Sequence, residues 1–431
     1  MPSDLQLGID FGTSGVRLCV RDPDGGIHAR AALPLPPPIG GEDVPERWRQ
    51  ALIVLLGRIP AELRDAIDTI CVDGTSGTLL LCDPHGEPLT PALMYDDARA
   101  REEAARIARV APLQSGAHGA TASLAKLMWL QKHVASDRPV HALHQAEWIT
   151  GLLLGRFGAG DENNALKLGY DPVRRTWPAW LDELDIPRGW LPDVHPAGTP
   201  LGTLSIYAAR TLGLPFRVRI VAGTTDSLAA VLATPAAKPG DAVTSLGSTL
   251  ALKVYAPHPV FAPEYGIYSH RLGDRWLAGG ASNAGGAVLR QFFSPERLAE
   301  LSEQIDPEVP TDLDYYPLPR PGERFPHADP ERQPRLTPRP ENDAVFLQGM
   351  LEGLARIEAE GYRRLQAAGA PPVQRVYSLG GGAVNEAYRH IRQRHLGVPV
   401  ESLPEAQAAC GAARLAADGI MPAGSNQGDN A

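Results

Sequence analysis

The sequence of 431 residues lacks any apolar run that approaches the roughly 18 residues of a membrane-spanning helix. It also begins without the basic and apolar leader of a secreted chain. Hydrophobic residues make up 43% of the chain and charged residues 21%, a composition typical of globular proteins. We therefore expect a cytoplasmic protein that does not contact a membrane.

Cysteine is scarce, and the four cysteines form no C-x-x-C motif. Cys19, Cys71 and Cys82 fall inside apolar, strand-like runs, and Cys410 stands far from them. Such positions favour buried thiols over metal ligands or disulfides. This cysteine usage indicates a reducing compartment.

Basic residues are in the minority, because 41 Lys and Arg, of which five are lysines, stand against 50 Asp and Glu and give a formal net charge of −9. This balance argues against a nucleic-acid partner, which would need a basic surface. Any phosphate site must then be local and built from backbone amides, with few cations. The length of the chain predicts two domains.

Two nucleotide-binding signatures are missing: no G-x-x-x-x-G-K-[ST] motif is present, and no G-x-G-x-x-G follows a strand-like run. Instead, three turns rich in glycine and hydroxyl residues follow apolar runs at 8–15, 73–78 and 245–249, and a glycine triplet opens 380–385. Exposed amides in such turns bind anions. Each segment alone could be an ordinary hairpin turn, but four in one chain favour phosphate binding. The likeness of 245–249 to 8–15 also suggests a duplicated architecture.

Two aspartates near these turns have candidate roles in phosphoryl transfer. Asp10 ends a strand beside a phosphate-binding turn, where a carboxylate would hold Mg²⁺. Asp226 stands between a strand and an Ala-rich helix, where a positioned carboxylate could accept the proton of an attacking hydroxyl. The alternative for Asp226 is a helix N-cap. Asp73 and Ser76 repeat the opening chemistry and would suit a polyol substrate, although Asp73 could equally be an ordinary turn residue.

Other features predict structure alone. Helical patterns occupy 98–111, 121–134 and 143–154, and a long helix ends near Gly369. His141 and His144 lack a third metal ligand and are interpreted as surface or packing residues. The ten prolines of 306–340 occur with buried-type aromatic residues, which predicts an ordered surface segment.

The segments 8–14, 245–249 and 380–385 resemble the FGGY family of carbohydrate kinases, in the actin, sugar kinase and Hsp70 ATPase superfamily. The resemblance runs from residue 7 to about 418, and 223–226 (Gly-Thr-Thr-Asp) stands where that family keeps its catalytic aspartate.

Within the family, three further segments resemble the D-ribulose kinases of cyanobacterial and plant type, a xylulose-kinase-like subgroup. They are Asp-Gly-Thr-Ser-Gly-Thr at 73–78, Asn-Ala-Leu-Lys-Leu-Gly-Tyr at 164–170 and Gly-Gly-Ala-Ser-Asn at 279–283.

The resemblance implies a role for individual residues. Asp226 would be the catalytic base, Asp10 would hold Mg²⁺, and Asp10, Ser76 and Asp226 would bind the sugar. The residues implied at ATP are Gly12, Thr13, Ser14, Gly247, Ser248, Thr249, Gly280, Gly381, Gly382 and Asn385.

The implied fold is α/β, with two RNase H-like domains flanking an ATP cleft. The sugar-binding domain would comprise 1–233 and a returning helix within 405–420, and the nucleotide-binding domain 234–404. Residues 421–431 are predicted to be a disordered tail.

The implied activity is ATP- and Mg²⁺-dependent phosphorylation of D-ribulose to D-ribulose 5-phosphate. Typical bacterial xylulokinases carry Gly-Gln-Met-His-Gly where this chain has Gly-Thr-Ser-Gly-Thr at 74–78, which disfavours D-xylulose. A kinase of D-xylulose or another small polyol is the alternative, and a non-kinase actin-like ATPase is a further one.

Overall fold

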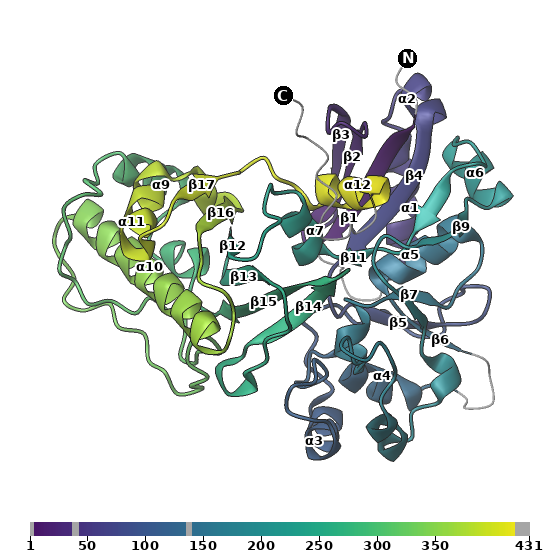
Figure 1. Ribbon diagram of the computed structural model, residues 1–431, viewed down its shortest axis with the longest axis horizontal. Coiled ribbons are helices and arrows are strands. Elements are labelled where there is room, and N and C mark those ends of the chain that lie inside the picture. Colours follow the sequence, from purple (N-terminus) through teal and green to yellow (C-terminus); the bar gives the residue numbers. More distant parts are fainter. Residues whose placement is uncertain (1–3, 37–42, 135–139, 419–431) are drawn as a thin grey trace. The chain divides into compact units, whose positions relative to one another are not determined.

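The computed structural model describes residues 4–36, 43–134 and 140–418. The chain forms two compact units (Figure 1). Unit 1 comprises Met1–Ala233, Arg271–Gly273 and Gln407–Ala431, and unit 2 comprises Thr234–His270 and Asp274–Ala406. The predicted disordered tail lies outside the described residues.

Unit 1 is built on a mixed seven-stranded sheet. Its strands, in spatial order, are β3 (Ile27–Pro34), β2 (Gly15–Arg21), β1 (Leu5–Gly12), β4 (Ile67–Gly74), β10 (Arg219–Val221) and β9 (Pro200–Thr203), with β11 (Thr224–Thr225) paired to β4. Two small sheets pair β5 (Leu79–Cys82) with β6 (His141–His144), and β7 (Ala159–Asp161) with β8 (Asp193–His195). The helices are α1 (Val44–Leu56), α2 (Ala61–Ala66), α3 (Arg101–Val110), α4 (Ser123–Gln131), α5 (Gln145–Leu154), α6 (Ile206–Leu212), α7 (Asp226–Leu232) and α12 (Ala408–Asp418), and short 3₁₀ turns cover Ala165–Leu168, Ala179–Leu184 and Arg188–Trp190.

The central strand β1 is buried from Leu5 to Phe11, as expected for a strand covered on both faces. Its hairpin with β2 has the two-residue turn Thr13-Ser14 between the paired Gly12 and Gly15. On its other side β1 runs parallel to β4.

Helix α12, the first element after the chain returns from unit 2, packs against β1 and α7 (Figure 1). Two glycines allow the close approach. A Cβ on Gly8 would overlap the carbonyl oxygen of Ala409, and a Cβ on Gly411 would overlap that of Ala229. Helix α12 begins at Ala408 and lies within unit 1.

Unit 2 repeats the plan of unit 1, because an antiparallel hairpin is followed by a parallel strand. Its six-stranded sheet has the order β14 (Tyr268–Leu272), β15 (Arg275–Ser282), β13 (Leu250–Ala256), β12 (Asp241–Leu246), β16 (Arg375–Leu379) and β17 (Val400–Ser402). The helices are α8 (Gly286–Leu289), α9 (Pro295–Ser302), α10 (Asp343–Ala367) and α11 (Glu386–Leu396), with 3₁₀ turns at Pro263–Tyr265 and Gly381–Val384. The likeness of the two glycine turns thus corresponds to a repeated topology.

A buried ion pair connects the helices of unit 2 to its sheet. Arg392 of α11 donates to both carboxylate oxygens of Glu358 on α10, at 2.6 and 2.7 Å. Arg392 also donates to Ser378 of β16, and Thr244 of β12 donates to Glu358. Because Arg392 and Glu358 are almost fully buried, each charge depends on the other for compensation.

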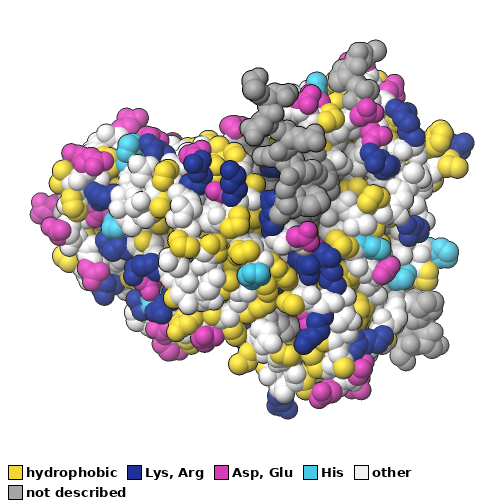
Figure 2. All heavy atoms as spheres, viewed as in Figure 1, with side chains coloured by type: hydrophobic (Ala, Val, Ile, Leu, Met, Phe, Trp, Pro, Cys, Tyr) yellow, Lys and Arg dark blue, Asp and Glu magenta, His cyan; other side chains and the backbone are white. Residues whose placement is uncertain are grey.

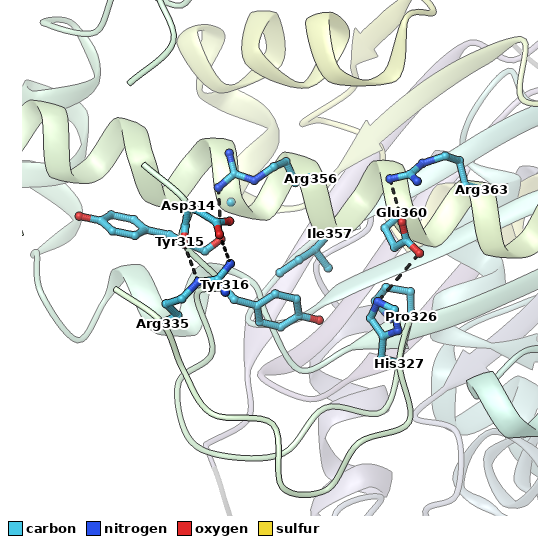
Figure 3. Close-up of a pocket in the computed structure, with 11 residues that line it drawn as sticks. Asp314, Tyr315, Tyr316, Pro326, His327, Arg335, Arg356, Ile357, Glu360 and Arg363 are labelled. Carbon is cyan, nitrogen blue, oxygen red and sulfur yellow. Dashed lines mark hydrogen bonds and ion pairs between the residues drawn. The ribbon is translucent and has the colours of Figure 1, made fainter. Parts of the chain in front are cut away.

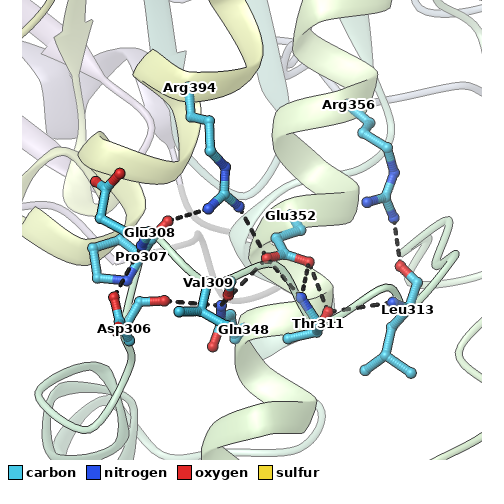
Figure 4. Close-up of polar contacts among 10 residues, drawn as sticks. All are labelled: Asp306, Pro307, Glu308, Val309, Thr311, Leu313, Gln348, Glu352, Arg356 and Arg394. Carbon is cyan, nitrogen blue, oxygen red and sulfur yellow. Dashed lines mark hydrogen bonds and ion pairs between the residues drawn. The ribbon is translucent and has the colours of Figure 1, made fainter.

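The proline-rich segment is ordered, as predicted, and polar contacts fix its start to α10 and α11 (Figure 4). Glu352 of α10 accepts hydrogen bonds from the Thr311 hydroxyl (2.6 Å) and from Arg394 of α11 (3.1 Å). Gln348 of α10 donates to the carbonyl oxygen of Val309 at 2.6 Å. Farther along the segment, Tyr315 and Phe325 are buried in the core of unit 2.

Candidate active site

The polar strand ends of unit 1 meet at one edge of its sheet. Asp10 of β1 pairs in register with Asp73 of β4, and Asp73 pairs with Thr224 of β11. The strands are parallel, so residues in register project to the same face of the sheet. The sequence segments around 10, 73 and 224 therefore form one polar cluster.

The two carboxyl groups of this cluster lie in an unfavourable environment for negative charge. Asp73 is fully buried, and Asp10 is 4% exposed. Burial raises the pKa of Asp10, and the guanidinium of Arg17 opposes that change. Burial raises the pKa of Asp73 well above its usual value, and the negative charges of Asp10 and Asp226 add to the effect.

Arg17 is a neighbour of Asp10 that the motif did not indicate. It lies opposite Asp10 in the β1–β2 hairpin, with Nη1 3.6 Å from Asp10 Oδ2. Arg17 also donates to the Ser14 hydroxyl at 3.2 Å. The two-residue turn fixes this register, so counting outward from Gly12 and Gly15 would have placed Arg17 beside Asp10.

The oxygen atoms at this edge suit a hard divalent cation. Asp10 Oδ1 and both carboxylate oxygens of Asp73 are buried and accept no hydrogen bond. Magnesium prefers oxygen ligands and is commonly held by one or two carboxylates together with water and phosphate. No group of three or more His, Cys, Asp or Glu side chains suitable for a metal occurs among the described residues, so nucleotide oxygens and water would have to complete the coordination.

Two of the five lysines hold the turn that carries Ser76. Lys126 of α4 is fully buried and donates to the carbonyl oxygens of Gly77 (2.8 Å) and Met94 (2.5 Å). Lys167 donates to the carbonyl oxygen of Ser76 at 2.9 Å. Burial is the main reason that the pKa of Lys126 is lowered to about 8, and the charge of Lys167 lowers it further.

Gln145, the first residue of α5, fixes the same turn from another side. Its side-chain oxygen accepts hydrogen bonds from the backbone amide (3.2 Å) and the hydroxyl (2.9 Å) of Thr75. Its backbone amide donates to the carbonyl oxygen of Thr78. Ser76 is the half-buried residue of an otherwise buried turn, so its side chain can be reached from solvent.

The loop after β7 brings a further polar group to the cluster. Asn163 donates to the Thr224 hydroxyl at 3.2 Å, and its own side-chain oxygen is buried without a hydrogen-bond partner. Asp161 organises this loop by accepting from the backbone amides of Asn163 and Asn164, both at 2.9 Å. Asn163 is thus a candidate substrate contact that sequence reasoning missed.

Asp226 follows β11 directly and begins α7. It is half-buried, and its Oδ1 accepts from the backbone amide of Ser227 at 2.7 Å. The N-cap of α7 is Thr225. The alternative interpretation of Asp226 as the helix N-cap is therefore wrong, because that position is occupied by the preceding residue.

In unit 2, the predicted phosphate-binding turn joins β12 to β13. Its backbone is held by the start of α8, since Gly286 donates to the carbonyl oxygen of Gly247 (2.9 Å) and Ala287 to that of Ser248 (3.1 Å). Arg290 donates to the Ser248 hydroxyl at 2.8 Å. Ser248 is exposed, and Arg290 adds a cation that the sequence pattern did not indicate.

The other predicted ATP contacts of unit 2 have structural partners of their own. Asn385 caps α11 by accepting from the Tyr388 amide, and its Nδ2 donates to Ser302 of α9. Gly380 and Gly381 are exposed after β16. Gly280 is buried in β15, where a Cβ would overlap the ring of Phe325. The ATP contacts of Asn385 and Gly280 stay predictions.

A separate pocket of about 340 Å³ lies in unit 2 between the proline-rich segment and α10 (Figure 3). None of the predicted site residues lines it. Its charges are paired locally, with Arg335 2.6 Å from Asp314 and Arg363 2.8 Å from Glu360.

On the face in Figure 2, acidic and basic side chains are interspersed. None of the described helices is both long and apolar enough to cross a membrane.

Comparison with known proteins agrees with this arrangement. The model of the N-terminal domain of the FGGY family of carbohydrate kinases matches residues 5–233, and the model of its C-terminal domain matches residues 220–419.

Individual relatives match over most of their length. Xylulose kinase of Escherichia coli (strain K12) is 25% identical, over 90% of this chain and 84% of that protein. Glycerol kinase of Gloeobacter violaceus is 27% identical, over 92% of this chain and 84% of that protein. The crystal structure of a xylulose kinase from Brucella ovis has the same fold, with a TM-score of 0.87 and 24% identity over 96% of this chain and 90% of that chain. Together the two family models cover residues 5–419, which is nearly the whole sequence. The chain therefore belongs to the FGGY family of ATP-dependent carbohydrate kinases.

Proposed function

We propose that the protein transfers the γ-phosphoryl group of ATP to the terminal hydroxyl of D-ribulose, giving D-ribulose 5-phosphate and ADP. The observation that carries the proposal is the edge of the unit 1 sheet, where Asp10 and Asp73 lie in register and Asp226 directly follows the neighbouring strand β11. Phosphoryl transfer depends mainly on positioning and charge stabilisation, and such a cluster can supply both.

Within this reaction Asp226 accepts the proton of the sugar hydroxyl as its oxygen attacks the γ-phosphorus. The transition state is loose, so the hydroxyl loses its proton late and needs a positioned carboxylate more than a strong base. Asp226 is half-buried at the start of α7, which leaves its side chain accessible to a small substrate.

Asp10, with Asp73 beside it on the adjacent strand, would hold Mg²⁺ through the carboxylate oxygens that accept no hydrogen bond. When bound, the cation would offset the negative charge of the phosphates. Arg17 contacts both the Asp10 carboxylate and the Ser14 hydroxyl of the Thr13-Ser14 turn. That turn would bind phosphate oxygens through backbone amides. Within unit 2, the turn 247–249 offers backbone amides of the same kind.

Ser76 would donate to or accept from a sugar hydroxyl, in a turn fixed by Lys126, Lys167 and Gln145. Asn163 offers a buried amide oxygen to the same cluster. The Ser76 hydroxyl and the Asn163 amide oxygen can form hydrogen bonds with the hydroxyl groups of a small polyol. The Gly-Thr-Ser-Gly-Thr sequence at 74–78 supports D-ribulose over D-xylulose as that polyol.

A second candidate is phosphorylation of D-xylulose, because several relatives of this chain are xylulose kinases. A coupled ADP-release screen over D-ribulose, D-xylulose, ribitol, D-arabitol and glycerol separates the two. We expect the highest kcat/KM with D-ribulose. A tenfold or greater preference for D-xylulose, about 1.4 kcal/mol in transition-state binding, would overturn the substrate assignment.

A further inference from the structure

Two cysteines far apart in the sequence meet where α12 packs against β2 of unit 1. Cys19 of β2 and Cys410 of α12 are 391 positions apart, yet their Sγ atoms lie 2.6 Å from one another. Cys19 is fully buried and Cys410 is half-buried, so an external reagent can reach the pair only through Cys410.

The surroundings of Cys410 favour its thiolate. Its contact with the Cys19 thiol lowers the pKa of Cys410 to about 7, burial opposes this, and the guanidinium of Arg30 contributes to the lowering. Cys410 also lies in the first turn of the eleven-residue helix α12, and a helix N-terminus stabilises a thiolate.

The other two cysteines lack this combination. Cys71 and Cys82 are fully buried, and burial raises the pKa of both thiols, that of Cys82 to about 12. Buried thiols of high pKa are inert toward oxidants and alkylating reagents. The chain therefore contains one reactive thiol with a second thiol directly beside it.

We propose that Cys19 and Cys410 form a site of thiol oxidation, at which a small-molecule disulfide converts the pair into an intramolecular disulfide bond. The Cys410 thiolate attacks one sulfur of the reagent, which forms a mixed disulfide and releases the first reagent thiolate. The contact with Cys410 and burial both raise the pKa of Cys19, so it gives up its proton only to a nearby base, the released reagent thiolate. Cys19 then attacks Cys410 Sγ, which forms the Cys19–Cys410 bond and releases the second thiolate. The protein loses two electrons and two protons, and the reagent gains the two electrons.

The bond would fix the helix that supports both candidate catalytic carboxylates. On one side α12 packs against Gly8, two residues before Asp10 in β1. On another side Gly411 packs against α7, the helix that Asp226 begins. Oxidation would thus tie the returning helix to β2 and restrict its local unfolding.

The test uses the full-length protein, reduced and then equilibrated with mixtures of oxidised and reduced glutathione. Peptide mapping by mass spectrometry is expected to show a Cys19–Cys410 peptide that has lost the mass of two hydrogen atoms. Cys71 and Cys82 should remain alkylatable after denaturation. The proposal is overturned if Cys410 stays reduced, or carries glutathione as its stable product, at the most oxidising ratio.

Three variants make the assignment specific. Cys410→Ser should abolish the cross-linked peptide, and the matched control Cys71→Ser should retain it. Cys19→Ala should leave glutathione on Cys410, because the resolving thiol is missing. In the oxidised wild-type protein, amide hydrogen exchange of α12 should be slower than in the reduced protein, and Cys410→Ser should show no such difference. Equal exchange of α12 in the oxidised and reduced wild-type protein would contradict the proposed tie to β2.

Discussion

Asp10 of β1 and Asp73 of β4 are register partners on adjacent parallel strands, and both lie in the interior of unit 1. When both carboxyl groups are ionised, their negative charges destabilise one another. A bound divalent cation would offset this repulsion. Three oxygens of these two aspartates are buried and accept no hydrogen bond, which is costly in a folded protein. Ligand binding at this edge of the sheet would explain why the chain has both aspartates there.

The pH dependence of stability can be tested at Asp161, which lies beside the same cluster. Burial and the charge of Glu147 raise the pKa of Asp161 to about 7. The folded state then binds a proton more tightly than the unfolded state, so this stabilisation is present below about pH 4 and lost as the pH rises to about 7. In the wild-type protein, Asp161 should make the free energy of unfolding fall by up to about 1.4 kcal/mol per pH unit across this window. Asp161→Asn should remove this contribution to the slope.

Urea unfolding at a series of pH values measures this change. The exposed Asp65, replaced by Asn, is the control and should keep the wild-type pH dependence. An Asp161→Asn protein with the wild-type slope would show that the raised pKa of Asp161 does not contribute to stability.

Lys126→Met should weaken sugar binding without affecting ATP. The substitution leaves the carbonyl oxygens of Gly77 and Met94 without their donor, so the turn carrying Ser76 loses its fixed position. We expect KM for D-ribulose to rise about tenfold, or 1.4 kcal/mol, with KM for ATP unchanged. Lys238→Met, at an exposed lysine of unit 2, is the control and should leave both KM values unchanged. An equal rise in both KM values would point to a general loss of structure instead.

Arg392→Met should destabilise unit 2 strongly. The substitution leaves Glu358 as a buried carboxylate without its ion-pair partner, which costs about 3–5 kcal/mol. Replacing both members, Arg392→Met with Glu358→Leu, should recover much of that loss. The midpoint of thermal unfolding measures both effects. A double variant no more stable than the single one would show that packing, not the unpaired charge, dominates.

Gly411→Ala should lower the midpoint of thermal unfolding even though alanine favours helices. The added Cβ would overlap the carbonyl oxygen of Ala229 and push α12 away from α7. Gly189→Ala, where an added Cβ has no neighbour within 4 Å, is the control and should leave the midpoint nearly unchanged. A stabilised Gly411→Ala protein would contradict the close helix contact.

Much of the architecture could be predicted from local sequence. The run before Asp10 forms a buried strand, the turn Gly12–Gly15 fixes the hairpin register, and the glycine turn at 247–249 recurs in a second sheet of similar topology. These features depend on residues close in sequence, where alternation and turn chemistry are informative.

The surroundings of the site could not be predicted in the same way. Lys126, Gln145 and Asn163 are single polar residues in apolar or irregular segments. Only tertiary packing brings the first two to the turn that carries Ser76, through Gly77 and Thr75, and Asn163 to Thr224. The contact of Cys410 with Cys19 depends on the return of α12 to unit 1. The sequence left the N-cap of α7 undecided, because Thr225 and Asp226 are both good capping residues and only the backbone distinguishes them.

The central claim is that Asp226 accepts the proton of the sugar hydroxyl, and its most direct test is turnover of D-ribulose by Asp226→Ala. The account predicts a fall in kcat of roughly 10²–10⁴, with calorimetric binding of Mg²⁺–ATP nearly unchanged. Asp43→Ala, which removes the N-cap of α1, is the control and should lose about 1 kcal/mol of stability while keeping its turnover. Phosphorylation of D-ribulose by Asp226→Ala at near the wild-type rate would contradict the account.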